Sequence, residues 1–121
     1  MTLPAQWSEG VKYFNEGKYW EAHEAWERGW VQLDSPIKSY VQSLIQVAAI
    51  FYLMSPEGGK RESAARRLAR SALAKSNCPP HLPRIEIPGR IEFLTRLCSE
   101  ADIAETIAWG RQGLRAIVIY S

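Results

Sequence analysis

Titratable and aromatic side chains gather in one short stretch of the sequence, residues 19–33. His23, Glu24 and Glu27 stand there among four aromatic residues. A histidine and a carboxylate four residues later lie one turn apart on a helix, so their side chains can meet. Such a pair can transfer a proton, hold a polar ligand or supply two ligands to a metal ion. These three residues are therefore the candidates for a catalytic or binding site.

Residues 18–33 are predicted to form the helix that positions these side chains. Successive residues are 100° apart around a helix axis, which sorts the sequence into faces. The face predicted to be buried carries His23 together with large apolar side chains, namely Tyr19, Trp26, Trp30 and Leu33. Glu27 follows at the edge of this face, and Glu24 lies further round. His23 is thus expected to enter an apolar environment beside Glu27, where pKa values shift and sites occur.

Three interpretations of His23 follow from this placement. The favoured one is a core histidine whose hydrogen bond goes to Glu27 or to a backbone carbonyl, because buried polar groups are generally paired. The second is a ligand pocket that uses His23 and the carboxylates. The third is a metal site with His23 and Glu27 as ligands, but a metal ion needs three or four. The only other histidine, His81, lies in a proline-rich stretch, and we expect no cofactor.

The sequence of this helix is compatible with a binding module or with an enzyme. A binding module would hold a small molecule or a partner segment in an aromatic pocket between helices 18–33 and 36–54. An enzyme would use Glu24 or Glu27 as general base, oriented by His23. We favour binding, because the sequence lacks a Gly-x-Ser-x-Gly elbow, a glycine-rich phosphate loop and the second histidine of a zinc-protease helix.

Five further segments have helical periodicity, so we expect an all-α fold in which residues 1–121 form one domain. The compact bundle of about five to six helices begins with a helical hairpin. Besides residues 18–33, the predicted helices cover about residues 3–15, 36–54, 60–75, 90–99 and 103–115. The segment 36–54 is apolar nearly all round, which predicts a central helix or one in a subunit interface. Gln46 on this segment either reaches the polar edge of helix 18–33 or faces solvent.

Two segments fall outside these helices. Residues 77–89 hold four prolines and are predicted to form an extended crossing loop within the domain. Residues 117–120 are β-branched and aromatic, and they either extend the last helix, dock on the core or pair across a dimer. A homodimer through helix 36–54 or through this apolar tail is therefore expected as one possible assembly.

The composition, 46% hydrophobic and 23% charged, is typical of a globular protein. No apolar run approaches the roughly 20 residues that span a bilayer, and no signal peptide is visible. Cys78 and Cys98 lack metal-site spacing, so we expect two free thiols, a cytoplasmic location and a buried Cys98. We expect no membrane partner.

Basic residues concentrate in the middle of the chain. Residues 60–96 carry nine Lys or Arg and three Asp or Glu, between two acidic segments. Arg66, Arg67 and Arg70 are the weak candidates for contacts with nucleic-acid phosphates or an acidic partner. A solvated helix face is the favoured interpretation, because no aromatic side chains interleave with these arginines as they do in single-strand binding sites.

The predicted N-terminal hairpin is similar to one tetratricopeptide unit. The similarity rests on the spacing of aromatic and small residues, namely Trp7, Gly10, Tyr13, Gly17, Tyr19, Ala22 and Trp26. It covers about 30 residues and is not repeated. Since one unit cannot form a solenoid, the similarity implies only hairpin packing, with small residues where the helices touch.

A second similarity covers most of the chain. The run Phe14-Asn-Glu-Gly-Lys-Tyr-Trp-Glu-Ala-His-Glu-Ala-Trp-Glu-Arg-Gly-Trp30, followed by residues 40–49, closely resembles the family known as domain of unknown function 309. This resemblance implies a small helical bundle whose biochemical function is not established. It also implies a signature set of ligand-binding residues, here Trp20, His23, Glu24, Glu27, Trp30 and Gln46. Ser43 replaces a usual glycine, and Phe51-Tyr52 replaces a common histidine, which removes the most obvious third metal ligand.

Overall fold

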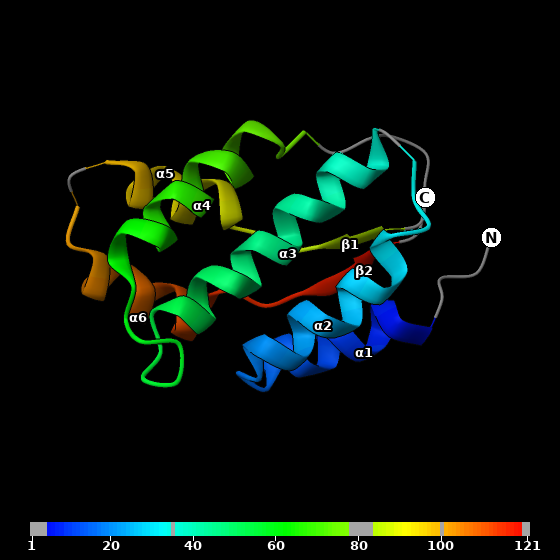
Figure 1. Ribbon diagram of the computed structural model, residues 1–121, viewed down its shortest axis with the longest axis horizontal. Coiled ribbons are helices and arrows are strands. Elements are labelled where there is room, and N and C mark those ends of the chain that lie inside the picture. Colours follow the sequence, from blue (N-terminus) through cyan, green and yellow to red (C-terminus); the bar gives the residue numbers. More distant parts are fainter. Residues whose placement is uncertain (1–4, 35, 78–83, 100, 120–121) are drawn as a thin grey trace.

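A computed structural model describes residues 5–34, 36–77, 84–99 and 101–119 (Figure 1). Within these ranges the chain forms six helices and two short strands. In order they are α1 (Ala5–Asn15), α2 (Tyr19–Trp30), α3 (Ile37–Leu53), α4 (Glu62–Ala74), β1 (Arg84–Glu86), α5 (Arg90–Cys98), α6 (Ile103–Gly113) and β2 (Ile117–Ile119). The predicted helical bundle is confirmed, and each helix lies within the bounds expected from the sequence.

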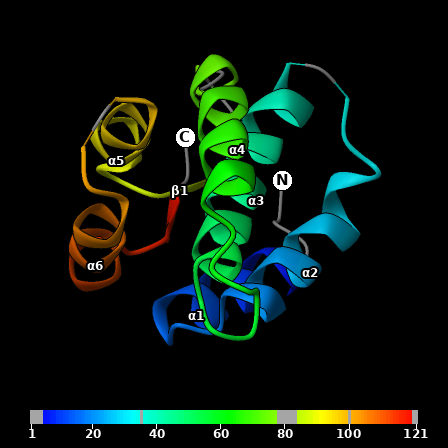
Figure 2. The same ribbon diagram turned by 60° about the vertical axis from the view of Figure 1, so that its left-hand side comes forward.

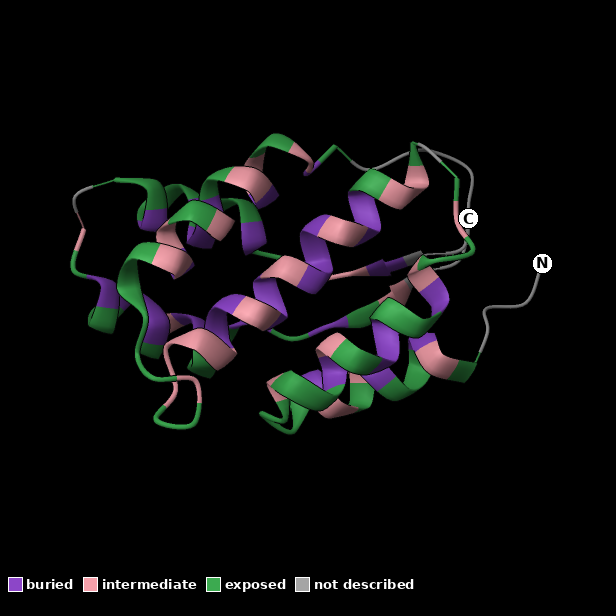
Figure 3. Ribbon diagram, viewed as in Figure 1, coloured by how far each residue is buried: buried purple, intermediate pink, exposed green. Residues whose placement is uncertain are grey.

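The helix α3 runs through the middle of the molecule, as its apolar sequence predicts. The hairpin of α1 and α2 lies on one side of it, and α4 packs along it (Figure 2). The helix α5 packs against α4, α6 packs against α5, and both reach Phe51 of α3. Buried residues recur along α3 (Figure 3), and they are Tyr40, Val41, Ser43, Leu44, Ile45, Val47, Ala48, Ile50 and Phe51. No helix in the described ranges is long and apolar enough to cross a membrane.

Two glycine–tryptophan contacts hold α1 against α2. A Cβ added at Gly10 would overlap the Trp26 indole, and one at Gly29 would lie 2.7 Å from Cζ2 of Trp7. The Trp26 indole N–H also donates a hydrogen bond of 3.2 Å to the carbonyl of Trp7. Both rings are almost completely buried. The two helices therefore approach at positions where one has no side chain and the other has the largest.

Two short strands, which the sequence did not predict, accompany the helical bundle. β1 and β2 pair antiparallel, with Ile85 opposite Val118. Each strand has three residues, too few for a period-2 pattern to stand out in the sequence. β1 lies within the predicted proline-rich loop, and β2 is the apolar tail whose conformation the sequence left open.

The tail docks on its own chain rather than extending α6. Asn15 donates from Nδ2 to the carbonyl of Ala116 at 3.0 Å and accepts from its N–H at 2.7 Å. Residues 120 and 121, like Cys78 and His81, lie outside the described residues. Both α3 and β2 contact other parts of their own chain. A homodimer through either segment stays a prediction.

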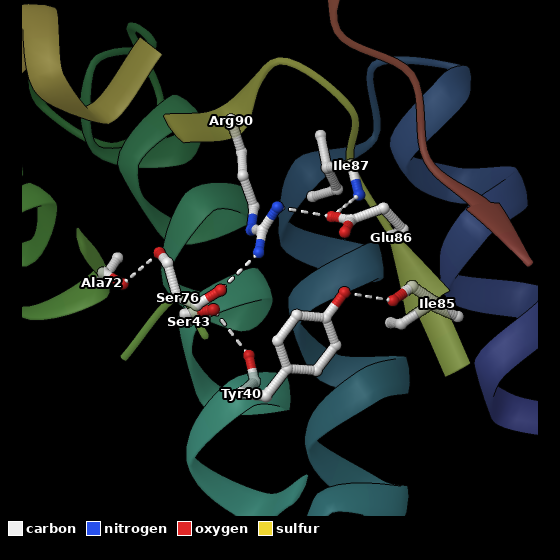
Figure 4. A network of polar contacts seen from close by, with 8 residues as sticks. All are labelled: Tyr40, Ser43, Ala72, Ser76, Ile85, Glu86, Ile87 and Arg90. Atoms are coloured by element: carbon white, nitrogen blue, oxygen red, sulfur yellow. Dashed lines mark hydrogen bonds and ion pairs between the residues drawn. The ribbon is translucent and has the colours of Figure 1, made fainter. Parts of the chain in front are cut away.

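A buried polar network joins α3, α4, β1 and α5 (Figure 4). Arg90 at the start of α5 donates to Oε1 of Glu86 at 2.7 Å and to the carbonyl of Ser76 at 2.6 Å. Its guanidinium lies 5.3 Å from the ring centre of Tyr40. The Tyr40 hydroxyl donates to the carbonyl of Ile85 at 2.7 Å. This network joins Ser76, which follows α4, and residues 85–86 of β1 to the start of α5 and to the central helix.

The expected burial of Cys98 is wrong. Its side chain is exposed at the last residue of α5. The buried face of that helix is formed by Arg90, Phe93, Leu94 and Leu97. Cys98 lies one residue past this face, where the helix ends.

The close approach of α1 and α2 makes Gly10 sensitive to substitution. Gly10→Ala is expected to lower the free energy of unfolding by about 2 kcal/mol, because the added methyl group overpacks the Trp26 ring. Gly113→Ala is the control, since nothing lies within 4 Å of a Cβ at that helical position. It should be neutral or slightly stabilising. Urea denaturation measures both, and equal effects would contradict the packing argument.

Arg90 and Arg96 provide a matched pair on α5, since each contacts a glutamate four residues earlier. The Arg90–Glu86 pair is buried, whereas the Arg96–Glu92 pair is exposed. Arg90→Met is expected to cost about 3 kcal/mol of stability, because it removes the cation from the largely buried Glu86 carboxylate, which keeps only the N–H of Ile87. Arg96→Met should cost less than about 1 kcal/mol. Thermal and urea unfolding check the difference, and a cost for Arg96→Met as large as that for Arg90→Met would overturn it.

Candidate functional site

The rotation of α2 about its axis differs from the predicted one. Its buried residues are Ala22, Ala25, Trp26 and Gly29. Small residues lie at the centre of this face because they let the backbones of α1 and α3 approach closely. Among the large residues predicted to be buried there, only Trp26 is, and Tyr19, Trp30 and Leu33 are half-buried. His23 therefore lies at the flank of the buried face rather than inside it.

The side chain of His23 is 20% exposed and contacts both Glu27 and Trp20. Its Nδ1 atom lies 3.4 Å from Oε2 of Glu27, too poorly aligned for a hydrogen bond. The Trp20 ring stacks on the imidazole with a centre distance of 5.0 Å. The Nδ1 atom is itself buried and has no hydrogen-bond partner among the described residues. His23 thus contacts Glu27, the partner that the favoured interpretation names, but it lies at the edge of the core and the contact is not a hydrogen bond.

A cleft of about 240 Å³ opens beside His23 between α2, α3 and α4. Its polar lining consists of His23, Glu27, Gln42 and Gln46. Trp30 and Leu68 form part of its apolar wall. Four of the six residues in the predicted ligand-binding set, His23, Glu27, Trp30 and Gln46, are brought together here. Whether they bind a ligand stays a prediction.

The other two residues of that set lie elsewhere. Trp20 is 44% exposed and packs between His23 and Tyr52, outside the cleft. Glu24 is exposed and does not line the cleft. The sequence prediction omitted Leu68. This residue is far from α2 in the sequence, and only the fold places it at the cleft. Gln42 was also missing from the set, although it stands one turn before Gln46 on α3.

Gln46 is only half satisfied. Its Nε2 lies 3.1 Å from Oγ of Ser71 on α4, and its buried Oε1 has no partner among the described residues. A serine hydroxyl can donate or accept, so Ser71 can satisfy either atom of the amide but not both. One polar atom of Gln46 thus stays unpaired whichever way the amide is turned.

Trp30 is held in place as a wall of the cleft. Its indole N–H donates to the carbonyl of Lys38 at 2.8 Å, and the Lys38 ammonium lies 4.6 Å from the ring centre. These contacts tie the end of α2 to the first turn of α3. The ring is therefore fixed before any ligand arrives.

The remaining candidates lie apart from the cleft. Arg66 donates from its guanidinium to the carbonyls of Leu97, Ser99 and Ala101, so that it fastens α4 to the α5–α6 turn. Arg67 and Arg70 are exposed on α4. In the described ranges, no three His, Cys, Asp or Glu side chains are arranged to hold a metal ion.

Residues 7–67 of the chain match the model of the family described as Domain of unknown function (DUF309). The chain belongs to the DUF309 family. The resemblance seen in the sequence is thereby confirmed. The DUF309 segment covers α1 to α3 and the first part of α4, so it contains the cleft residues of α2 and α3. No curated protein and no solved structure matches this chain.

The half-satisfied amide of Gln46 has a measurable consequence. Ser71→Ala removes its remaining partner and is expected to cost about 1–2 kcal/mol of stability. Adding Gln46→Met removes both unpaired polar atoms and should restore most of that loss. Ser63→Ala, at an exposed position of the same helix, measures the gain in helix propensity alone. Urea denaturation of Ser71→Ala, Gln46→Met, the double variant and Ser63→Ala measures these stabilities. The argument fails if Gln46→Met costs the same free energy of unfolding with and without Ser71.

Proposed function

We propose that this protein is a binding module whose cleft between α2, α3 and α4 takes a small polar ligand. One observation carries the proposal. Two buried polar atoms that have no hydrogen-bond partner among the described residues, Nδ1 of His23 and Oε1 of Gln46, belong to side chains that line the same cleft. Each such atom costs roughly 1–3 kcal/mol when it stays unpaired. A ligand that supplies the missing hydrogen bonds offsets this cost.

The lining of the cleft indicates the chemistry of the ligand. The Glu27 carboxylate, half exposed at the mouth, only accepts hydrogen bonds when ionised. Trp30, Ile45 and Leu68 provide an apolar surface. The volume of about 240 Å³ is below that of drug-sized pockets. These features favour a small amide or amine with an apolar side over a large or strongly anionic molecule.

The enzyme alternative keeps less support. It needs a general base within reach of a bound substrate. Glu24 lies outside the cleft, which leaves Glu27 beside His23 as the pair for proton transfer. The third alternative is binding of nucleic acid or an acidic partner to the basic segment 60–96. Arg66 does not support it, because its guanidinium already donates to backbone carbonyls. Arg67 and Arg70 alone provide no comparable site.

Ligand binding can be tested by thermal-shift screening of small amides and amines. Compounds that bind the cleft should raise the melting temperature of the wild-type chain by about 4 °C at about tenfold excess over the dissociation constant. The Glu27→Gln variant should lose this shift, because it loses the acceptor charge at the mouth. The control variant Glu24→Gln changes the same residue type one turn back, outside the cleft, and should keep it.

Two results would contradict this proposal. One is a library without any stabilising compound. The other is a set of compounds that stabilise Glu27→Gln as strongly as the wild type, which would place their site elsewhere.

A further inference from the structure

A second and larger hollow, of about 750 Å³, lies away from the cleft. It is bounded by the turn between α1 and α2, the segment that follows α3, and the end of α6. These three parts of the chain meet at the same end of the molecule in both ribbon views (Figures 1 and 2). None of the cleft residues lines this hollow.

Three aromatic rings form much of its wall. Tyr19 is fixed from behind by Phe51, at a ring-centre distance of 4.5 Å and an interplanar angle of 21°. Trp20 packs at 4.8 Å from Tyr52. Trp20 is one of the few large hydrophobic residues that stay exposed. The hollow thus offers a fixed and partly uncovered aromatic surface.

Two arginines at the end of α6 complete the wall. Arg115 donates to the carbonyls of Leu114 and Arg111 through Nη1 alone, which leaves its other N–H groups available. In the described part of the chain, no carboxylate lies within ion-pair distance of Arg111 or Arg115. Burial raises the pKa of the Tyr19 hydroxyl, and both guanidinium groups oppose that rise. Both cations therefore lie near enough to the phenol oxygen to act on it, and neither forms an ion pair in the described part of the chain.

Carboxylates also border the hollow, and they limit what can enter. Glu16 contacts the ammonium of Lys18 at 3.7 Å. Glu21 and Glu57 line the hollow and make no ion pair in the described ranges. Their charge repels an extended polyanion such as a nucleic acid, because like charges brought together are unfavourable. A single small anion can contact the arginines without approaching all three carboxylates.

We infer that this hollow binds a small anion with a planar ring, its phosphate or carboxylate held by Arg111 and Arg115 and its ring against Trp20 and Tyr52. Guanidinium groups pair with such oxyanions through two parallel hydrogen bonds. Aromatic rings stack on tryptophan and tyrosine with a modest gain beyond the buried area. The site shares no lining residue with the cleft between α2, α3 and α4, although Trp20 also stacks on His23 of that cleft.

The experiment is a ¹H–¹⁵N NMR titration of the full 121-residue chain with phenyl phosphate and with benzoate. Either anion should shift the indole signal of Trp20 and the amide signals of residues 17–21 and 111–115. The expected dissociation constant is on the order of 1 mM for so small a ligand. Phenol, which has the ring without the anion, should bind at least about tenfold more weakly.

Variants locate the site. Arg111→Gln should weaken the binding of phenyl phosphate about tenfold. Arg67→Gln, which removes an exposed arginine from α4, should leave it unchanged. Glu27→Gln in the cleft should also leave it unchanged, so this test does not depend on the cleft ligand. Circular dichroism verifies that each variant is folded.

Three results would overturn the inference. The first is no shift at Trp20 with either anion up to about 20 mM, well above the expected constant. The second is unchanged affinity in Arg111→Gln, and the third is binding of phenol as tight as that of phenyl phosphate.

Discussion

Two glycines and two tryptophans hold α1 against α2, each indole lying on backbone that carries no side chain. The Trp26 N–H is satisfied by a carbonyl of α1, so the ring is buried without an unpaired donor. This contact sets the rotation of α2 about its own axis. Once Ala22, Ala25 and Gly29 face inward, His23 and Glu27 must lie at the flank that meets α3 and α4. The geometry of the cleft is therefore a consequence of how the hairpin packs.

At the cleft, polar side chains replace the close apolar packing of the core. Elsewhere the core is filled by apolar residues, and the buried guanidinium of Arg90 is held by Glu86 and a carbonyl, with its Nε unpaired among the described residues. At the cleft, His23 and Gln46 each have a buried atom without a hydrogen-bond partner in the described ranges, and both side chains line one opening. An apolar side chain at either position would pack without that cost. Residues that lower stability in this way are typical of sites that trade stability for binding.

Much of the fold could be predicted from the sequence, because helix periodicity and end signals are local. Asp102, for example, accepts a hydrogen bond from the N–H of Glu105 and so caps α6 through a contact between residues three positions apart. The face of α2 was placed wrongly because large aromatic residues were assumed to lie innermost. Close helix contacts instead favour alanine and glycine, which an angular plot of hydrophobicity underrates. The strand pair, the cleft wall from α4 and the role of Arg66 depend on residues far apart in the sequence, which no local pattern reveals.

The hydrogen bonds between Asn15 and Ala116 join residues 101 positions apart, across the boundary of the family match. Two further contacts cross that boundary, since Phe51 stacks on Phe93 at 4.9 Å and Tyr40 donates to the carbonyl of Ile85. The segment recognised as the family thus packs against residues beyond its end. Residues 84–119 cover aromatic side chains that residues 7–67 leave open. The family match and the packed core consequently have different boundaries in this chain.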